Sequence, residues 1–170
     1  MPATILTTPV AKSIVVAPQA KARAAGHGIP HGLSGLACAG LLGLPQANAE
    51  QLRQAILEGL PFSAIEHLGR HLSISSAELA EEIQLPARTF QRRKTEDRFH
   101  PDESDRLVRL SQIAAKAIEL FEGDAPGAKQ WLQTPAVALG GIAPLKYAQT
   151  YLGAQEVENL IERLEDGIFS

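Results

Sequence analysis

The chain has 170 residues, 16 Lys and Arg against 19 Asp and Glu, and a formal net charge of −3 at pH 7. This length fits one domain, or two small ones with a flexible segment, and the mild negative charge argues against a protein that binds nucleic acid over its whole surface. The single cysteine, Cys38, excludes an intramolecular disulfide and a site built from several cysteine ligands.

The first 32 residues are rich in Ala, Pro, Thr and Gly, and their charged side chains (Lys12, Lys21 and Arg23) are all basic. The apolar cluster Ile14–Val16 is too short to build a core. We therefore expect residues 1–32 to form an arm that is disordered or is ordered by a partner. A basic arm that contacts phosphates and a plain spacer both fit this composition.

The longest apolar stretch, Leu33–Leu44, is much shorter than the roughly 20 residues of a membrane-spanning helix. The uncharged start, Met1–Thr8, lacks the basic residues that open a signal peptide. We expect a cytoplasmic protein that does not bind membranes.

From Leu33 onward the apolar residues recur at helical spacing, which predicts helices over Leu33–Leu44, Glu50–Leu57 and Phe62–Leu72. His67 and His71 lie four residues apart, a spacing that suits a metal. No third ligand is evident nearby, and Leu68 stands where a zinc hydrolase helix has Glu. We interpret both as ordinary histidines, with a metal site as the weaker alternative.

Residues 75–94 have the pattern of a helix-turn-helix. Ser75 and Glu78 have the spacing of a capping box at the start of the first helix, and Gln84–Pro86 form the turn. Pro86 is suited to open the second helix because that position needs no N–H donor. In that helix, Ala87–Lys94, four of eight residues are basic and none is acidic.

The basic helix predicts contact with DNA. Arg88, Gln91 and Arg92 share one face at spacings of three and four residues, and Arg and Gln side chains can each bond two groups on a base edge. The flanking side chains that suit phosphate contact are Thr89, Arg93 and Lys94. A solvated basic face is the alternative. One such helix contacts few phosphates, so useful specificity requires a dimer.

The remaining elements are also predicted to be helical, so we expect an all-α fold. A helix opens at Pro101, with a long apolar stripe from Leu107 to Phe121. Three shorter helical pieces follow, over about Ala128–Leu132, Pro144–Leu152 and Gln155–Glu165.

The C-terminal segment has the features of a partner-binding region. Trp131, Leu139 and Leu145 can gather into a small core around Gly140 and Gly141, and Leu160 belongs to the buried stripe of the last helix. Gly167 ends that helix and leaves two apolar residues, Ile168 and Phe169, before Ser170. An apolar end of this kind either packs on its own domain or docks on another protein.

These segments together resemble the Xre/MbcA/ParS family of antitoxins, from about Leu33 to Ser170. The matching elements are Arg88-Thr89, Arg92-Arg93-Lys94, Glu103–Leu107, Trp131-Leu132, Pro135, Leu139–Gly141, Pro144-Leu145 and Gly153. Two positions depart from the family pattern: Gln84 stands where the turn often has Gly, and Pro86 where Ser often caps the second helix. A non-glycine residue such as Gln84 either adopts a left-handed backbone, at a cost of roughly 1 kcal/mol, or changes the turn.

The resemblance implies an antitoxin that binds its own promoter DNA and neutralises a co-encoded RES-domain toxin, which resembles ADP-ribosyltransferases and consumes NAD. From this and the apolar end of the chain, we hypothesise that Gly167–Ser170 lie at or over the NAD site of the toxin and block entry of its substrate. The residues then expected to contact the toxin are Trp131, Leu139, Leu145, Leu160, Glu165, Gly167, Ile168, Phe169 and Ser170.

We thus expect three regions: the arm 1–32, a helix-turn-helix and dimerisation domain at 33–122, and a toxin-binding domain at 123–170. No catalytic set, metal site or cofactor motif stands out, so an enzyme is not expected. The principal alternative is a stand-alone helix-turn-helix regulator that forms a homodimer and has no toxin partner. A second alternative is a pure inhibitor whose helix-turn-helix no longer binds DNA.

Overall fold

The computed structural model describes residues 34–45 and 47–167, and within these ranges every regular element is a helix. The arm predicted at 1–32 and the terminal residues 168–170 lie outside them. The elements are α1 (Ser34–Leu41), α2 (Ala49–Glu58), α3 (Ser63–Leu72), α4 (Ser76–Glu82), α5 (Ala87–Glu96), α6 (Pro101–Leu120), α7 (Ala125–Gln133), a 3₁₀ turn (Val137–Leu139), α8 (Pro144–Tyr147) and α9 (Tyr151–Glu165). The all-α prediction is confirmed.

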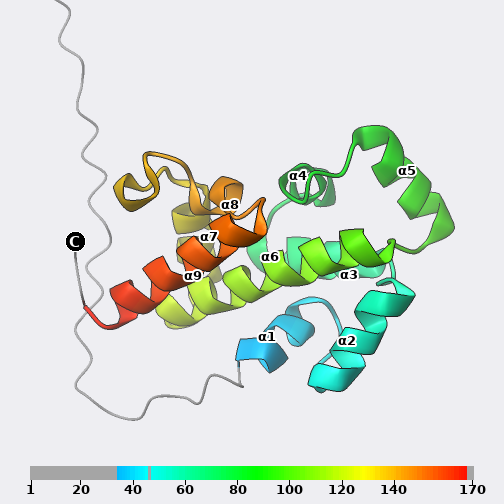
Figure 1. Ribbon diagram of the computed structural model, residues 1–170, viewed down its shortest axis with the longest axis horizontal. Helices are drawn as coiled ribbons and strands as arrows, with labels where there is room; N and C mark the ends of the chain where they lie inside the picture. Colours follow the sequence, from blue (N-terminus) through cyan, green and yellow to red (C-terminus); the bar gives the residue numbers. More distant parts are fainter. Residues whose placement is uncertain (1–33, 46, 168–170) are drawn as a thin grey trace, which may run out of the picture.

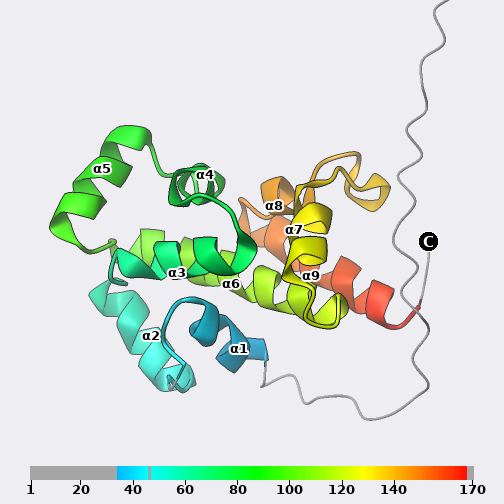
Figure 2. The same cartoon turned by 180° about the vertical axis from the view of Figure 1, so that it is seen from behind.

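The longest helix, α6, is the central support of the fold. Its 20 residues pack against α1 and α2 and, farther along, against α7 and α9 (Figure 1). Its apolar stripe is buried as predicted, with Leu107, Ile113 and Ala117 fully enclosed. Seen from both sides, α5 lies at one end of the molecule and the last turn of α9 at the other (Figures 1 and 2).

The starts of α2, α4 and α9 are fixed by local side-chain caps. Ser75 Oγ accepts from the amide of Glu78 at 3.2 Å, and the Glu78 carboxylate accepts from the amide of Ser75 at 3.0 Å. This confirms the capping box predicted for the first helix of the helix-turn-helix. Asn48 and Gln51 form a second box, not foreseen from the sequence, at the start of α2.

One predicted helix is wrong, because Pro144–Leu152 is two helices. α8 ends at Tyr147, and α9 begins at Tyr151 after the cap residue Thr150, whose Oγ1 accepts from the amide of Gly153 at 3.0 Å. A Cβ on Gly153 would lie 1.9 Å from the carbonyl oxygen of Tyr147. Only glycine therefore allows α9 to start so close to α8.

No helix in the described part of the chain is both long and apolar enough to cross a membrane.

Candidate nucleic-acid interface and C-terminal surface

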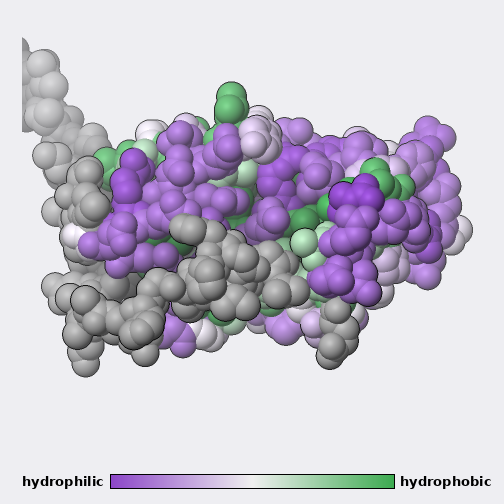
Figure 3. All heavy atoms as spheres, turned by 60° about the horizontal axis from the view of Figure 1, so that its bottom comes forward, coloured by the Kyte–Doolittle hydropathy of each residue, from purple (hydrophilic) through white to green (hydrophobic). Residues whose placement is uncertain are grey.

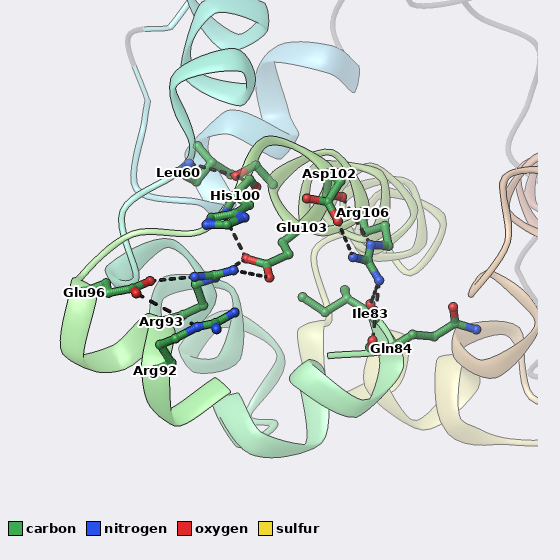
Figure 4. A network of polar contacts seen from close by, with 11 residues as sticks. Leu60, Ile83, Gln84, Arg92, Arg93, Glu96, His100, Asp102, Glu103 and Arg106 are labelled. Carbon is green, nitrogen blue, oxygen red and sulfur yellow. Dashed lines mark hydrogen bonds and ion pairs between the residues drawn. The ribbon is translucent and has the colours of Figure 1, made fainter. Parts of the chain in front are cut away.

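The turn between α4 and α5 has a left-handed residue at its centre. Gln84 has φ of +56°. Of the two expected possibilities, a left-handed backbone or a changed turn, this non-glycine residue therefore adopts the left-handed backbone. The buried side chains of Ile83 and Leu85 fix the chain on either side. From α6, Arg106 Nη1 donates to the carbonyl oxygens of Ile83 and Gln84 at 2.9 and 3.4 Å (Figure 4). These bonds offset part of the cost of the strained backbone.

α5 begins without a side-chain cap. Pro86 occupies the cap position with an extended backbone, and no side chain bonds the first amides of the helix. Phe90 anchors α5 to the core through a tilted ring contact with Phe62, 5.3 Å between centroids. Ala87, three residues before Phe90 in the sequence, is exposed and adds nothing to this contact.

The outer face of α5 is basic and open to solvent. Arg88, Gln91, Arg92 and Lys94 are exposed, and Thr89 is half-buried. Arg92 is 4.0 Å from Glu96, and its side chain remains 58% exposed. The structure therefore brings Arg88, Gln91 and Arg92 to one accessible surface, and their contact with DNA remains a prediction.

Arg93 does not fit the phosphate contact expected from the sequence, because the residue is only 2% exposed. Its Nε and Nη2 donate to the two carboxylate oxygens of Glu103 at 2.6 and 3.0 Å, and its Nη1 donates to Glu96 at 2.6 Å. Glu103 also accepts from the amide of His100 at 2.8 Å. These contacts tie α5 to the first turn of α6 (Figure 4).

The charges of this pair stabilise each other. Burial by itself raises the pKa of the Glu103 carboxyl, but the hydrogen bonds and charge of Arg93, with the amide of His100, outweigh it and lower the pKa below its ordinary value. The same bonds raise the pKa of Arg93. From the sequence, Glu103 was named only within the family-matching run Glu103–Leu107, with no partner assigned to it. An acid ten residues after a basic helix gives no local sign that it is buried.

Three residues expected to contact a toxin lie in the protein's own core, where their apolar pattern had also placed them. Leu139 and Leu145 are 4% exposed and Leu160 is 8% exposed. Trp131 is half-buried and packs against Phe121, with 6.4 Å between ring centroids. In this structure the three leucines are not available to another protein.

Other apolar side chains of the same segment are exposed, and the sequence analysis did not single them out. Val137 is 95% exposed, Leu152 72% and Ile142 44%. Ile142 and Leu152 line one hollow of about 320 Å³, together with Tyr147. We call Val137, Ile142 and Leu152 the apolar ledge. On the face seen in Figure 3, hydrophobic side chains are scattered in small patches among mostly hydrophilic ones.

The loop that carries Val137 and Ile142 is closed by backbone bonds. The amides of Ala136 and Gly141 donate to the carbonyls of Ile142 and Ala136 at 3.2 and 2.9 Å, and Leu139 anchors the loop in the core. Gly140 and Gly141 both have positive φ, which permits this tight return. Val137 is therefore held in solvent by an ordered loop.

The last turn of α9 gathers negative charge. Partial burial, then the neighbouring Glu119, raises the pKa of the Glu165 carboxyl above its ordinary value. Glu162 instead pairs with Lys116 at 3.2 Å. Gly167, exposed and with φ of +71°, follows the helix. Ile168, Phe169 and Ser170, also expected to contact a toxin, lie outside the described residues.

The histidine pair gives no support to the metal alternative. Among residues 34–45 and 47–167 no group of three or more His, Cys, Asp or Glu side chains has a metal-binding arrangement. His67 Nδ1 accepts a hydrogen bond from Arg70 Nη2 at 3.0 Å, so its neighbour is a cation.

Two family models match the chain in succession. Residues 51–111 match the antitoxin Xre-like helix-turn-helix domain. Residues 116–167 match the antitoxin Xre/MbcA/ParS C-terminal toxin-binding domain. The first match contains α5 and its basic face, and the second contains the apolar ledge.

Curated relatives are similar over most of the chain. A protein named antitoxin Xre from Yersinia enterocolitica is 38% identical over 130 residues, which is 76% of this chain and 88% of the relative. One of the same name from Photorhabdus laumondii is 31% identical over the same shares. A third, from Pseudomonas putida, is 36% identical over 49% of this chain and 52% of the relative.

Proposed function

This chain belongs to the Xre family of antitoxins, and on that premise we propose that it neutralises a co-encoded toxin and binds its own promoter DNA. The observation that carries the proposal is the separation of two accessible surfaces along α6. The basic face of α5 lies in the region that matches the helix-turn-helix model, and the apolar ledge lies in the region that matches the toxin-binding model.

The DNA-binding role is assigned to the exposed face of α5. Arg88, Gln91 and Arg92 read base edges, while Thr89 and Lys94 contact phosphates. Arg93 holds α5 in place instead of contacting DNA, because its guanidinium is buried against Glu103. Because one such helix contacts few phosphates, a homodimer that presents two α5 helices to two half-sites supplies the specificity.

The toxin-binding role is assigned to the C-terminal segment. The toxin is a RES-domain protein that consumes NAD, and residues from Gly167 to Ser170 lie over its NAD site. The exposure of Gly167 and its left-handed backbone support this, because they end α9 and turn the chain away from it. We assign Glu165, in the last turn of α9, and the half-buried Trp131, packed against Phe121, to the same binding role. Leu139, Leu145 and Leu160 support the surface from within.

The apolar ledge extends this assignment beyond the residues expected from the sequence. Exposed apolar side chains on an ordered loop favour a surface that another protein covers. Val137 and Leu152 contribute little to the core at 95% and 72% exposure. We assign both to contact with the toxin. Because the proposed partners are promoter DNA and a toxin that consumes NAD, the proposed location of the protein is the cytoplasm.

The test is co-expression of the tagged chain with the protein encoded beside it, followed by size-exclusion chromatography and an NAD-consumption assay. We expect a stable complex that consumes no NAD, and loss of NAD when Ile168–Ser170 are deleted. The deletion lies beyond the last helix and should leave the helical circular dichroism spectrum unchanged. Continued neutralisation by the truncated chain would contradict the proposed role of the C-terminus. A homodimer that does not bind the protein encoded beside it would indicate a DNA-binding regulator without a toxin.

A further inference from the structure

The C-terminal region is in direct contact with the turn that sets the angle between α4 and α5. Gln149, in the connection from α8 to α9, uses both ends of its side-chain amide. Its Nε2 donates to Glu82 Oε2 at 3.1 Å, and its Oε1 accepts from Gln84 Nε2 at 3.5 Å. Glu82 is the last residue of α4, and Gln84 is the left-handed residue of the turn. One side chain of the proposed toxin-binding region thus bonds the end of α4 and the centre of the turn that follows it.

The same bend is held from its other side by α6. Arg106 donates to the carbonyl oxygens of Ile83 and Gln84 and pairs with Asp102 at 2.9 Å. Figure 4 shows the Arg106 guanidinium directed at these two carbonyls while the Gln84 side chain extends away from them. Arg106 and Asp102 belong to the rigid central helix. The contact from Gln149 is therefore the one that a displacement of the C-terminal region changes.

A displacement of the start of α9 also displaces Gln149. Only the three residues 148–150 separate α8 from α9. Gly153 lies against the Tyr147 carbonyl, and the Thr150 cap fixes the first turn of α9. A connection this short and this closely packed shifts as one piece.

The apolar ledge is next to this connection. The hollow between Ile142 and Leu152 is also lined by Tyr147, Thr150 and Gly153, the residues on either side of Gln149. A protein that covers the ledge therefore presses on the segment that carries Gln149.

From these contacts we propose that Gln149 couples the two proposed surfaces, so that a toxin bound on the ledge changes the affinity of α5 for DNA. This rests on the proposed function, since it needs both partners. Gln149 is a positioning residue: it contacts neither partner and acts through Glu82 and Gln84. Because the coupling is thermodynamic, DNA must change the affinity for the toxin by the same factor.

The experiment compares two dissociation constants for each variant. Fluorescence anisotropy at fixed salt measures binding to a labelled duplex of the region upstream of this gene, with the neighbouring protein absent and then saturating. For the unaltered chain we expect the two constants to differ by about fivefold or more. For Gln149→Ala we expect a difference of less than about twofold. Circular dichroism and toxin binding should be unchanged in this variant.

Two further variants separate coupling from a general loss of structure. Glu82→Gln combined with Gln149→Glu exchanges donor and acceptor, so the bond re-forms in the opposite sense. This double variant should recover the coupling that Gln149→Glu alone loses through repulsion of the two carboxylates. Gln133→Ala is the control, because it alters an exposed glutamine at the end of α7. This variant should show the same toxin-dependent change in DNA dissociation constant as the unaltered chain, including any part that comes from assembly driven by the toxin.

Three results overturn the inference. The first is an unaltered chain whose DNA affinity does not respond to the toxin. The second is a Gln149→Ala chain with the same response as the unaltered one, and the third is a double variant that fails to recover the response. Each requires that both partners bind. If the unaltered chain binds neither the duplex nor the neighbouring protein, it is the proposed function that fails, and the inference fails with it.

Discussion

The DNA-facing and C-terminal regions are held to α6 by different forces. α5 is tied to α6 by charge, because Arg93 and Glu103 form a buried ion pair. Phe90 is the only apolar side chain of α5 that is buried. α9 packs along α6 mainly through apolar side chains, with Val157 and Ile161 fully buried, and the ion pairs of Lys116 with Glu158 and Glu162 lie at the edge of this contact.

The difference shows how each region keeps a surface for binding. In α5 only Phe90 and Arg93 are buried, so the inner face of this helix is fixed by one aromatic side chain and a paired charge instead of a continuous apolar stripe. α9 packs through its apolar stripe, so an apolar side chain that stays exposed on it, such as Leu152, is accessible to another protein. Four variants test this contrast, and the largest effect comes first.

Glu103→Ala tests whether charge holds the DNA-facing region. It leaves the buried Arg93 guanidinium with only the exposed Glu96 carboxylate as a partner, so the free energy of unfolding should fall by about 3–5 kcal/mol. Urea denaturation followed by circular dichroism measures it. Asp102→Ala, an exposed acid in the same helical turn, should cost about 1 kcal/mol or less. Equal losses for the two variants would contradict a structural role for the buried pair.

Ile161→Ala tests whether apolar packing holds the C-terminal region. The side chain is 0% exposed, and its truncation should lower the free energy of unfolding by about 2–5 kcal/mol. Leu152→Ala is the matched control, because the same kind of side chain is 72% exposed there. It should change stability by about 0.5 kcal/mol at most and yet weaken the toxin complex. If Leu152→Ala lowered the free energy of unfolding as much as Ile161→Ala, apolar burial would not be what holds α9 to α6.

Arg92→Ala separates the outer face of α5 from its buried side. Its side chain is 58% exposed and is held only by a 4.0 Å contact with Glu96, so stability should hardly change. DNA binding should weaken by about 1–3 kcal/mol in a mobility-shift titration at fixed salt. Arg53→Ala, which removes another exposed arginine on α2, should leave the titration unchanged. Arg92 is not a DNA contact if the two variants titrate alike.

Glu165→Gln gives the smallest effect and concerns the end of α9. The raised pKa means that folding disfavours the charged carboxylate, so stability falls as pH rises from the ordinary glutamate pKa through the raised one. The variant should remove this fall and add about 0.3–1 kcal/mol near neutral pH, where a negative charge opposes the helix dipole.

Glu162→Gln is the control for this helix end. Glu162 accepts from Lys116, so its neutralisation should not stabilise the protein. Thermal unfolding at several pH values compares the two variants. The expected sign for Glu165 would be wrong if both variants lost stability at neutral pH. Weaker toxin binding by Glu165→Gln, despite its gain in stability, would support its assignment as a contact residue.

Prediction from the sequence was most successful where the cause is local. The capping box of Ser75 and Glu78, the turn at Gln84 and the apolar stripe of α6 depend on residues a few positions apart, and all three are confirmed. The single helix over Pro144–Leu152 was wrong because its interruption depends on Gly153 meeting the Tyr147 carbonyl. Helical spacing does not record such a contact.

For the site residues too, prediction succeeded where the cause is local and failed where it depends on a distant partner. Periodicity placed Arg88, Gln91 and Arg92 on one face, but it could not tell that the adjacent Arg93 turns inward. Likewise it marked Leu139, Leu145 and Leu160 as apolar without showing whether they face the protein's own core or a partner. Each answer depends on what lies opposite in space, such as Glu103 for Arg93.

The sequence by itself determined the helices, the helix-turn-helix with its basic second helix, and the likeness to a family, because capping, spacing and composition act over short stretches of chain. Only the tertiary structure decided that Arg93 is buried, that Val137, Ile142 and Leu152 are exposed, and that Gln149 contacts the bend between α4 and α5. Burial and pairing depend on the opposing residue, and folding brings Gln149 and Glu82 together across 67 positions of the chain.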